Sequence, residues 1–323
     1  MTSYIKHSDC FDEFKNIKST SIDFVCVDLP YGQTACGWDT RIDLKQMWQE
    51  LKTICKDDCI YAFFCTVKFG NSLINSNPKW FRYDIVWEKS STVGYLSANK
   101  MPLRKHEMIY IFSTMGCDDL ENKRNLELRE YASKVKKHIG LSVNALNKKI
   151  GNQGIDHFYR VKSTQFGLPT RKTYNELIEH FNIDKMEGFI NYDTLRSMWC
   201  KYTYNPQKTP GKPYKVKRGK KKNKDVYGQA EIPDHENKTG ARHPTSIIKF
   251  NHDKENYHRT QKPVKLCEWL IKTYTNKGDT VLDFTMGSGS TIVACKNIKR
   301  RYIGIEKDSN IFKIAEDRLC KLI

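Results

Sequence analysis

The sequence predicts an α/β protein with a mostly parallel, twisted sheet that helices cover on both faces. At both ends of the chain, short apolar runs rich in β-branched residues alternate with stretches of helical spacing. Runs that are apolar along their whole length are typical of strands buried on both faces. The middle of the chain is charged and has few such runs, which predicts an inserted helical module.

The first group of predicted elements lies between residues 20 and 115. It consists of the strands IDFVCVDL (22–29), CIYAFFCT (59–66), YDIVWEK (83–89) and EMIYIF (107–112) and the helix LKQMWQELKTIC (44–55). The second group lies near the C-terminus. It consists of the helix LCEWLIKTYT (266–275), the strand TVLDF (280–284), a Gly-rich turn, the helix STIVACKNI (290–298) and the strand RYIGIE (301–306). Both groups have the alternation of a strand-helix-strand unit.

Residues 117–200 separate the two groups and contain charged, amphipathic stretches of helical spacing. LELREYASKVKKHIGLSVNALNKKIG (126–151) and TRKTYNELIEHFNI (170–183) are the clearest. Their order has a weak similarity to a helix-turn-helix. A generic helical bundle is the alternative.

Length and composition exclude several classes of protein. The chain has 323 residues, with 55 Lys and Arg against 37 Asp and Glu, which gives a net charge of +18. No run of about 18 apolar residues is present and acids interrupt the start, so we expect no membrane span or signal peptide but a soluble, cytoplasmic protein. The 11 cysteines are not spaced as CxxC, so we expect reduced thiols, no disulfide framework and no metal.

The positive charge is concentrated in one part of the chain. Residues 201–262 hold 16 Lys and Arg against 6 Asp and Glu, more than half of the surplus in under a fifth of the length. The densest stretch, KPYKVKRGKKKNK (212–224), has no apolar periodicity and is predicted to be an exposed, mobile loop. A solvated charge run is the plain alternative. The position of this stretch between two chemically informative motifs favours a polyanionic partner.

The first motif is Asp28-Leu29-Pro30-Tyr31-Gly32, at the carboxyl end of an apolar strand. Open α/β sheets build their sites at such ends. Pro30 fixes its own φ and biases Leu29 toward an extended conformation, so the Asp28 carboxylate and the Leu29 carbonyl are adjacent acceptors. An exocyclic amine presents two N–H bonds that match them, and Tyr31 offers a face for a planar ring. The same residues also form an ordinary turn sequence.

The second motif is DFTMGSGST (283–291), between a predicted strand and a predicted helix. Gly287 and Gly289 permit a tight turn and close approach of a ligand to the backbone. Glu306 ends the next strand, where a carboxylate binds ribose hydroxyls. The dinucleotide pattern GxGxxG fails at Ile292, which disfavours an NAD-dependent dehydrogenase, and no GK[ST] follows as in a Walker A loop. A cofactor with adenosine but no pyrophosphate is indicated.

Together with HRTQKPVKLCEWLI (258–271), the two motifs closely resemble those of the amino-methyltransferases of DNA, which use S-adenosyl-L-methionine to methylate an exocyclic base nitrogen. The resemblance covers residues 20–115 and 242–315 and implies a Rossmann-like methyltransferase fold. The order of the motifs is similar to the beta group, in which target recognition lies between them. Asp28 resembles the adenine-N6 enzymes, since Ser is usual there in cytosine-N4 enzymes. Leu29 replaces the commoner Pro.

The resemblance implies roles for individual residues. The catalytic set is Asp28, Leu29, Pro30 and Tyr31. The cofactor-binding set is Asp9, Thr260, Lys262, Pro263, Asp283, Phe284, Gly287, Gly289 and Glu306. The DNA-binding set is Arg104, His106, Lys215, Lys217, Arg218, Lys220 and Lys221. Within these sets, Asp9 is expected at the adenine ring of the cofactor and Lys262 at its methionine carboxylate; a helix cap and a surface turn are their plain alternatives.

The resemblance also divides the chain. Residues 1–116 are expected to form the catalytic half of the domain, 117–250 the inserted helical and basic target-recognition region, and 251–323 the cofactor-binding half. The implied activity is site-specific methylation of adenine N6 in double-stranded DNA, with the base flipped out of the duplex. Cytosine-N4 or RNA methylation and a catalytically silent DNA-binding protein on the same fold are open alternatives. A homodimer and a cognate restriction endonuclease are further partners that the resemblance suggests.

Overall fold

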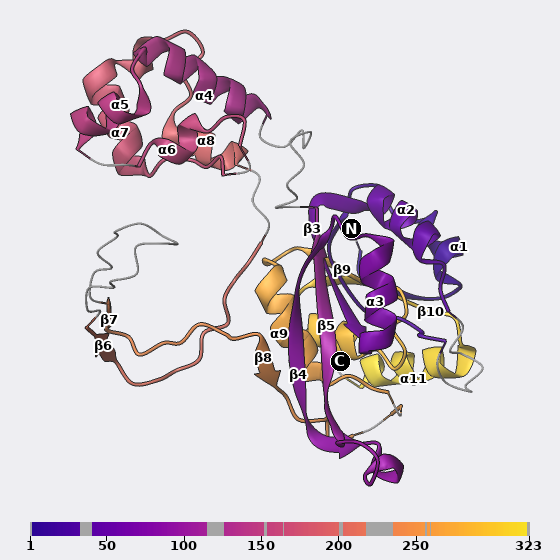
Figure 1. Ribbon diagram of the computed structural model, residues 1–323. Coiled ribbons are helices and arrows are strands. Elements are labelled where there is room, and N and C mark those ends of the chain that lie inside the picture. The colour runs from indigo at the N-terminus through magenta and orange to yellow at the C-terminus, as the bar shows by residue number, and fades with distance from the viewer. Residues whose placement is uncertain are drawn as a thin grey trace. The chain divides into compact units, whose positions relative to one another are not determined.

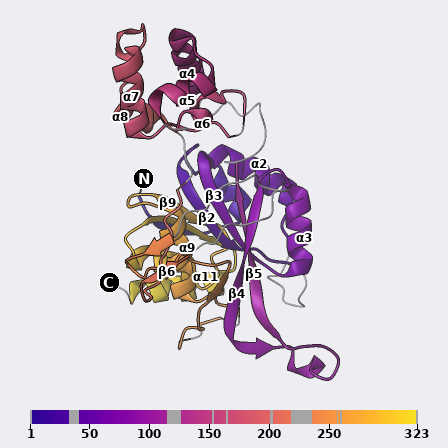
Figure 2. The same ribbon diagram turned by 60° about the vertical axis from the view of Figure 1, so that its left-hand side comes forward.

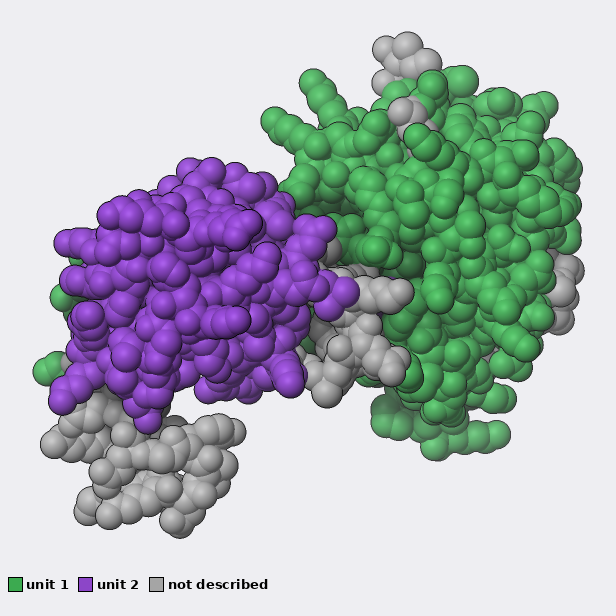
Figure 3. Space-filling view, turned by 90° about the horizontal axis from the view of Figure 1, so that it is seen from above, with its two compact units in different colours: residues 1–112, 203–323 green, residues 113–202 purple. Residues whose placement is uncertain are grey.

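The computed structural model of the chain is drawn in Figure 1, and it describes residues 2–32, 41–114, 126–151, 154–163, 165–199, 203–217, 235–255, 257–258 and 260–321. The chain separates into two compact units, residues 1–112 with 203–323 and residues 113–202 (Figure 3). The first unit contains the sheet and both motifs. The described elements of the second unit are all helices.

The described part of the first unit has an eight-stranded sheet at its centre. Its strands are β1 (Tyr4–His7), β2 (Ile22–Asp28), β3 (Cys55–Cys65), β4 (Phe81–Val93), β5 (Arg104–Ser113), β8 (Ile247–Lys249), β9 (Thr280–Asp283) and β10 (Arg301–Glu306). Across the sheet they lie in the order β1-β10-β9-β2-β3-β5-β4-β8. Neighbours from β1 to β3 pair in parallel, β4 and β5 pair antiparallel, and β8 is parallel to β4. The predicted mostly parallel sheet is confirmed.

Helices pack on both faces because the strands are apolar on both faces. On β2, Val25 and Val27 belong to one core, whereas Phe24 and Cys26 belong to the other. The first core is completed by α1 (Cys10–Phe14), α2 (Leu44–Ile54) and α3 (Val67–Ser76). The second is completed by α9 (Val264–Tyr274) and α10 (Ser290–Asn297). Figure 1 shows α2 and α3 on one side of the sheet and α9 on the other.

The sheet topology determines where a site can form. From β9 the chain passes through α10 to β10 on one side, whereas β2 is followed by β3 on the other, so the strand order reverses between β9 and β2. Ligands in open α/β sheets bind at such a reversal, beyond the carboxyl ends of the strands. Asp28, Asp283 and Glu306 are the last residues of β2, β9 and β10, and these parallel strands end at the same edge.

The second unit, whose helices are drawn in Figure 2, has a hydrophobic core of its own. Its helices are α4 (Leu126–Ile139), α5 (Val143–Ile150), α6 (Asp156–Tyr159), α7 (Arg171–Phe181), η2 (Ile183–Lys185) and α8 (Tyr192–Met198). On α4, Leu128, Tyr131, Ala132 and Val135 are buried, the spacing of one helical face. Residues 126–199 are thus helical as predicted. Whether residues 117–250 act together in target recognition stays a prediction.

Residues 203–217 and 235–249 belong to the first unit and form a two-stranded ribbon. β6 (Tyr214–Val216) pairs antiparallel with β7 (His235–Asn237). The prediction of a loop over residues 212–224 is therefore wrong at 214–216. These residues pair with β7, about 20 positions later in the sequence, and the charge pattern does not indicate that pairing. The base of the ribbon is attached to the unit by Asn205, whose backbone N–H donates to Thr273 O at 2.7 Å.

The structure bears on three expectations from composition, each only for the residues that it describes. No helix in the described ranges has both the length and the apolar character that a membrane crossing requires. The cysteines that the structure describes are free thiols, and six of them are buried: Cys26, Cys55, Cys59, Cys65, Cys267 and Cys295. In the same part of the chain, no three or more His, Cys, Asp or Glu side chains are grouped as metal ligands.

Candidate active site

Two cavities open beside Asp28, the residue at which β2 ends. The larger cavity, of about 630 Å³, is lined by residues of both motifs, including Leu29, Pro30 and Phe284. The smaller cavity, of about 230 Å³, is lined by residues of β4 and β5. A shared wall belongs to both, formed by Asp28, Tyr31, Thr260, Gln261 and Lys262. The first motif therefore lies between two spaces, of which the larger has the size of an ordinary small-molecule site.

The Asp28 carboxylate is the central group of the shared wall. Tyr31 donates its hydroxyl to Asp28 Oδ1 at 2.6 Å, and Lys262 Nζ lies 2.5 Å from Oδ2. About a quarter of the Asp28 side chain remains exposed. Burial raises the pKa of Asp28 above its ordinary value, and the Lys262 ammonium opposes this rise. Asp28 is therefore a hydrogen-bond acceptor with raised proton affinity.

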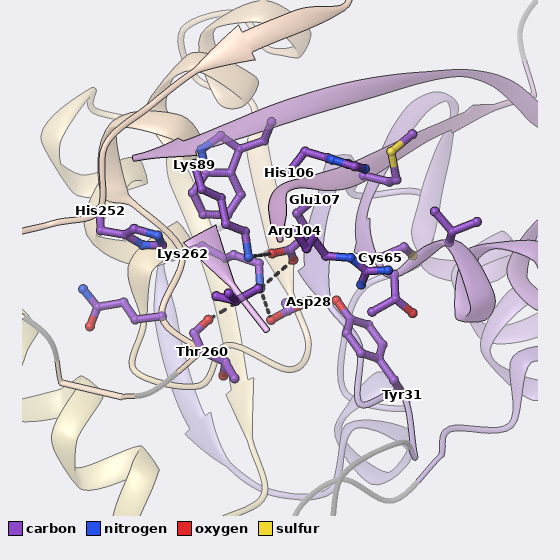
Figure 4. A pocket seen from close by; sticks show the side chains of 16 residues that line it. Asp28, Tyr31, Cys65, Lys89, Arg104, His106, Glu107, His252, Thr260 and Lys262 are labelled. Carbon is purple, nitrogen blue, oxygen red and sulfur yellow. Dashed lines mark hydrogen bonds and ion pairs between the residues drawn. The ribbon is translucent and has the colours of Figure 1, made fainter. Parts of the chain in front are cut away.

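Asp28 is one end of a chain of alternating charges, shown in Figure 4. Lys262 Nζ lies 3.1 Å from Glu107 Oε1, and Lys89 Nζ lies 2.7 Å from Glu107 Oε2. Burial alone would lower the pKa of Lys262, but the two carboxylates outweigh it and the pKa is raised. Burial alone would raise the pKa of Glu107, but Lys262 and Lys89 outweigh it and the pKa is lowered. Lys262 and Glu107 are thus both held in their charged forms.

The contacts of Lys262 in the structure differ from the cofactor contact expected for it. The resemblance implies a contact with the methionine carboxylate of a cofactor, whereas the ammonium lies between Asp28 and Glu107. Sequence reasoning missed Glu107 and Lys89 as site residues. Glu107 does occur in the stretch NKMPLRKHE, next to His106, but no spacing in the chain indicates that β5 brings its side chain to Asp28.

The Gly-rich turn after β9 is connected to the neighbouring strands. The Gly287 N–H donates to Glu306 Oε2 at 2.9 Å, and the Asp308 N–H donates to Oε1 at 2.9 Å. The Thr285 hydroxyl donates to the Asp28 carbonyl at 3.0 Å. Gly287 has a φ of +52°, a conformation that favours glycine. The turn therefore has a fixed position relative to both Asp28 and Glu306.

Two further acids line the larger cavity. Asp283 is almost fully buried, and burial raises its pKa to about 7. Asp9 caps α1, accepting from the Phe11 N–H at 3.0 Å, and its other oxygen lies 2.9 Å from Lys307 Nζ. Asp9 is thus both the helix cap of the plain alternative and a residue of the cavity wall.

The TQKP segment is fixed by a network that sequence reasoning did not anticipate. Gln261 donates to Asp253 Oδ2 at 3.1 Å, and the Val264 N–H donates to the same oxygen at 3.1 Å. Arg318 of α11 (Ser309–Cys320) is buried, lies 3.6 Å from that oxygen and donates to Ser288 O at 3.1 Å. The segment before α9 and the Gly-rich turn are therefore joined through one arginine of the last helix.

The remaining predicted site residues lie in several different parts of the chain. Thr260 lines both cavities, whereas Pro263 and Gly289 line neither and are the N-caps of α9 and α10. Arg104 and His106 on β5 line the smaller cavity. Lys215 and Lys217 belong to the ribbon, where Lys215 Nζ lies 3.0 Å from Glu236. Arg218, Lys220 and Lys221 are outside the described residues.

A family model described as DNA methylase matches residues 22–317, which include both motifs and every strand of the sheet except β1. The chain belongs to the N6/N4 DNA methylase family. Asp9 lies ahead of the matched residues. The family covers both adenine-N6 and cytosine-N4 enzymes, so membership leaves the target base open.

Curated relatives are similar to this chain over short stretches. The type II methyltransferase M.HindIII of Haemophilus influenzae is 40% identical over 82 residues, which cover 25% of this chain and 26% of the relative. The type II methyltransferase M2.DpnII of Streptococcus pneumoniae is 47% identical over 62 residues, which cover 19% of this chain and 23% of the relative. The matched part thus spans about a quarter of the length of these relatives.

A solved structure of low sequence identity is similar to this chain over almost its whole length. The PvuII DNA methyltransferase (cytosine-N4-specific) has a TM-score of 0.51 at 11% identity, with 98% of this chain and 86% of that chain covered. This likeness shows the methyltransferase fold that the sequence motifs imply.

Proposed function

We propose that this protein transfers a methyl group from S-adenosyl-L-methionine to the N6 amino group of an adenine flipped out of double-stranded DNA. The observation that carries the proposal is the position of the Asp28 carboxylate at the wall between two cavities. Methyl transfer needs a donor site and an acceptor site that meet at one point, and the shared wall is such a point.

The larger cavity is the proposed cofactor site. Glu306 accepts one backbone N–H on each oxygen, so each oxygen retains a lone pair for a ribose hydroxyl. Asp9, Asp283, Phe284 and Gly287 line the remaining wall. When bound, S-adenosyl-L-methionine supplies an electrophilic methyl group on its sulfonium.

The first motif is the proposed acceptor site for the base. An adenine amino group is a poor nucleophile because its lone pair is delocalised into the ring. The Asp28 carboxylate and the Leu29 carbonyl accept its two N–H bonds, which favours rehybridisation and directs the lone pair at the methyl group. Asp28 or water then takes the extra proton, and the raised pKa of Asp28 suits that role.

Two neighbouring side chains, those of Tyr31 and Lys262, contact the Asp28 carboxylate. The Tyr31 hydroxyl is bonded to Asp28, which fixes the ring as a stacking surface for the flipped base. The Lys262 ammonium occupies one Asp28 oxygen, where an amino group would also donate. Glu107 offers the ammonium a second partner, so Lys262 keeps an ion pair when the base displaces it from Asp28. The contact first expected between Lys262 and the methionine carboxylate requires the same displacement.

Double-stranded DNA is the proposed partner. The surplus of 18 positive charges favours a phosphate backbone, which gives affinity without sequence choice. Residues 117–250 are the proposed target-recognition region, with Lys215, Lys217, Arg218, Lys220 and Lys221 as phosphate contacts. A homodimer and a cognate restriction endonuclease stay predictions. Asp28 favours adenine over cytosine as the base.

The test is a product analysis with the purified protein. Methyl-labelled S-adenosyl-L-methionine is incubated with duplex DNA from cells that lack methylation, and the DNA is digested to nucleosides. We expect label in N6-methyladenine. Label in N4-methylcytosine would contradict the base assignment, and duplex DNA without label would contradict the proposed substrate.

The matched variant is Asp28→Ala. It removes an acceptor and proton carrier, so we expect methylation to fall by about 100-fold or more. Cofactor affinity by calorimetry should persist, because Asp28 contributes only to the shared wall. An Asp28→Ala protein that methylates normally would exclude this site.

A further inference from the structure

The hairpin of β4 and β5 ends in an ordered turn that exposes large apolar side chains. Leu96 is fully exposed, and the exposed fractions of Tyr95 and Met101 are 81% and 60%. Backbone hydrogen bonds of 2.9 Å from Ser97 N to Gly94 O and 3.0 Å from Met101 N to Ser97 O fix the turn, which contains η1 (Tyr95–Ser97). Ordered apolar side chains held in water indicate an interaction surface.

The same hairpin forms a wall of the smaller cavity. Val93 on β4 is paired with Arg104 on β5, and both line that cavity together with Lys89, His106 and Glu107. Tyr95 follows two residues after Val93, a backbone length of roughly 7 Å. Figures 1 and 2 both show the two strands continuing beyond the sheet to this turn. The exposed turn and the candidate base pocket are therefore one continuous structure.

The charges around the turn select the class of partner. Residues 89–106 contain Lys89, Lys100, Arg104 and Lys105 and no Asp or Glu. Lys100 and Arg104 are exposed, and in the sequence they follow Tyr95 and Leu96 and flank Met101. An apolar tip between cations fits a DNA duplex, whose bases offer stacking surfaces and whose phosphates flank them.

We propose that Tyr95 and Leu96 enter the base stack of the duplex and fill the gap left by the flipped base, while Lys100 and Arg104 contact the flanking phosphates. The inference rests on the proposed function, since it requires a base in the smaller cavity. Removing a base from the duplex loses its stacking, at a cost of a few kcal/mol. An aromatic and an aliphatic side chain in the gap restore part of that contact. The internal hydrogen bonds of the turn hold both side chains ready.

The test compares two duplexes that carry the target sequence found by methylation mapping. One is fully paired, and the other has an abasic site opposite the target base, so that flipping loses less pairing. The double variant Tyr95→Ser with Leu96→Ser is measured against wild type by single-turnover methylation. Gln49→Ser, which shortens an exposed side chain on α2 that lines neither cavity, is the control.

We expect the double variant to lose roughly 10-fold or more in rate on the paired duplex, the size of one aromatic stacking contact. On the abasic duplex its rate should lie close to that of wild type. With 2-aminopurine at the target position, the fluorescence rise that reports an unstacked base should shrink in the double variant. The control should match wild type on both duplexes.

Three results would overturn the inference. If the double variant lost the same factor in methylation rate on both duplexes, the turn would contact DNA without filling the gap. If it lost no rate on either duplex, the turn would have no part in the reaction. A change from dimer to monomer in sedimentation, caused by the double variant, would assign the turn to contacts between copies of the chain. A wild-type protein that methylates neither duplex would instead refute the proposed function, and this inference with it.

Discussion

Among single residues, Asp28 shows how one neighbouring cation controls a reactive group. Because the Lys262 ammonium favours the charged form of Asp28, its removal by Lys262→Met raises the pKa of Asp28 further. The acceptor is the carboxylate, so the acid limb of the pH–rate profile for methylation should move to higher pH. Lys265→Met is the control, since Lys265 is exposed and contacts Glu268 on α9. An acid limb that stays in place would contradict the role given to Lys262.

A separate measurement distinguishes the two roles of Lys262. If its ammonium binds the methionine carboxylate during the reaction, Lys262→Met also weakens cofactor binding by calorimetry. If it acts through Asp28 alone, cofactor affinity stays within about 2-fold of wild type, the change expected from a distant surface charge.

Asp283 makes the stability of the fold depend on pH. Its pKa is raised by burial to about 7, well above that of an unfolded Asp. Between roughly pH 4 and pH 7 the folded protein keeps a proton that the unfolded chain has released, so this residue's contribution to stability falls as pH rises through that window. Asp283→Asn removes the titration, and the decline in the free energy of unfolding from pH 5 to pH 8 should become smaller.

Urea unfolding at pH 5 and pH 8 measures this change in the free energy of unfolding. Each unit by which folding raises the pKa of Asp283 corresponds to about 1.4 kcal/mol. Asp43→Asn is the control, because Asp43 caps α2 at an exposed position, where Asn also serves as a cap. A wild-type decline that persists unchanged in Asp283→Asn would show that the carboxyl is charged in the folded protein.

At the scale of elements, β10 and the Gly-rich turn depend on a close approach at Gly304. A Cβ at this position would lie 2.6 Å from Met286 Sδ and 2.9 Å from Ile292 Cδ1, and both side chains are buried. Gly304→Ala should therefore displace the turn next to Gly287 and destabilise the protein by about 1–3 kcal/mol. Cofactor binding should weaken as well. Thermal unfolding and calorimetry measure the two effects.

The control for this variant is Gly167→Ala in the second unit. There a Cβ would lie 3.6 Å from His157 Cβ, an ordinary contact. Normal stability and cofactor affinity in Gly304→Ala would contradict the proposed coupling between β10 and the turn.

The elements show why some of this site is predictable from sequence. β2 and β9 are apolar runs that end in an acid and a turn, so Asp28 and Asp283 could be recognised from local pattern alone. Glu107 could not, because its place beside Lys262 depends on the antiparallel pairing of β5 with β4. Long-range pairing leaves no periodicity in the sequence. The short β8 and the ribbon strand β6 were missed for the same reason.

For the whole molecule, the positive surplus predicts how binding to DNA depends on salt. Replacing Lys215 and Lys217 by Gln should reduce the slope of log affinity against log salt by about 1–2, because each phosphate contact adds roughly one unit. The methylated sequence should stay the same. Lys277→Gln is the control. This exposed lysine precedes the start of β9, whereas Asp28 lies at the carboxyl end of the parallel strand β2. An unchanged slope in the double variant would remove the ribbon from the DNA contact.

The chain carries its proposed chemistry in one unit and a separate core in the other. The charged amphipathic pattern of residues 126–199 indicated this division, because helices that bury their own apolar face need no contact with the sheet. The two segments that carry the catalytic motif and the cofactor motif thus form one α/β unit. The residues between them in the sequence include a separate helical unit.

The most direct measurement is modification-sensitive sequencing of DNA from cells that express the wild-type chain, beside cells that express Asp28→Ala. We expect N6-methyladenine at one recurring sequence in the first sample and none in the second. N4-methylcytosine at a recurring sequence would contradict the base assignment. Unmodified DNA in the wild-type sample, from cells that contain the folded protein, would contradict the proposed methyl transfer itself.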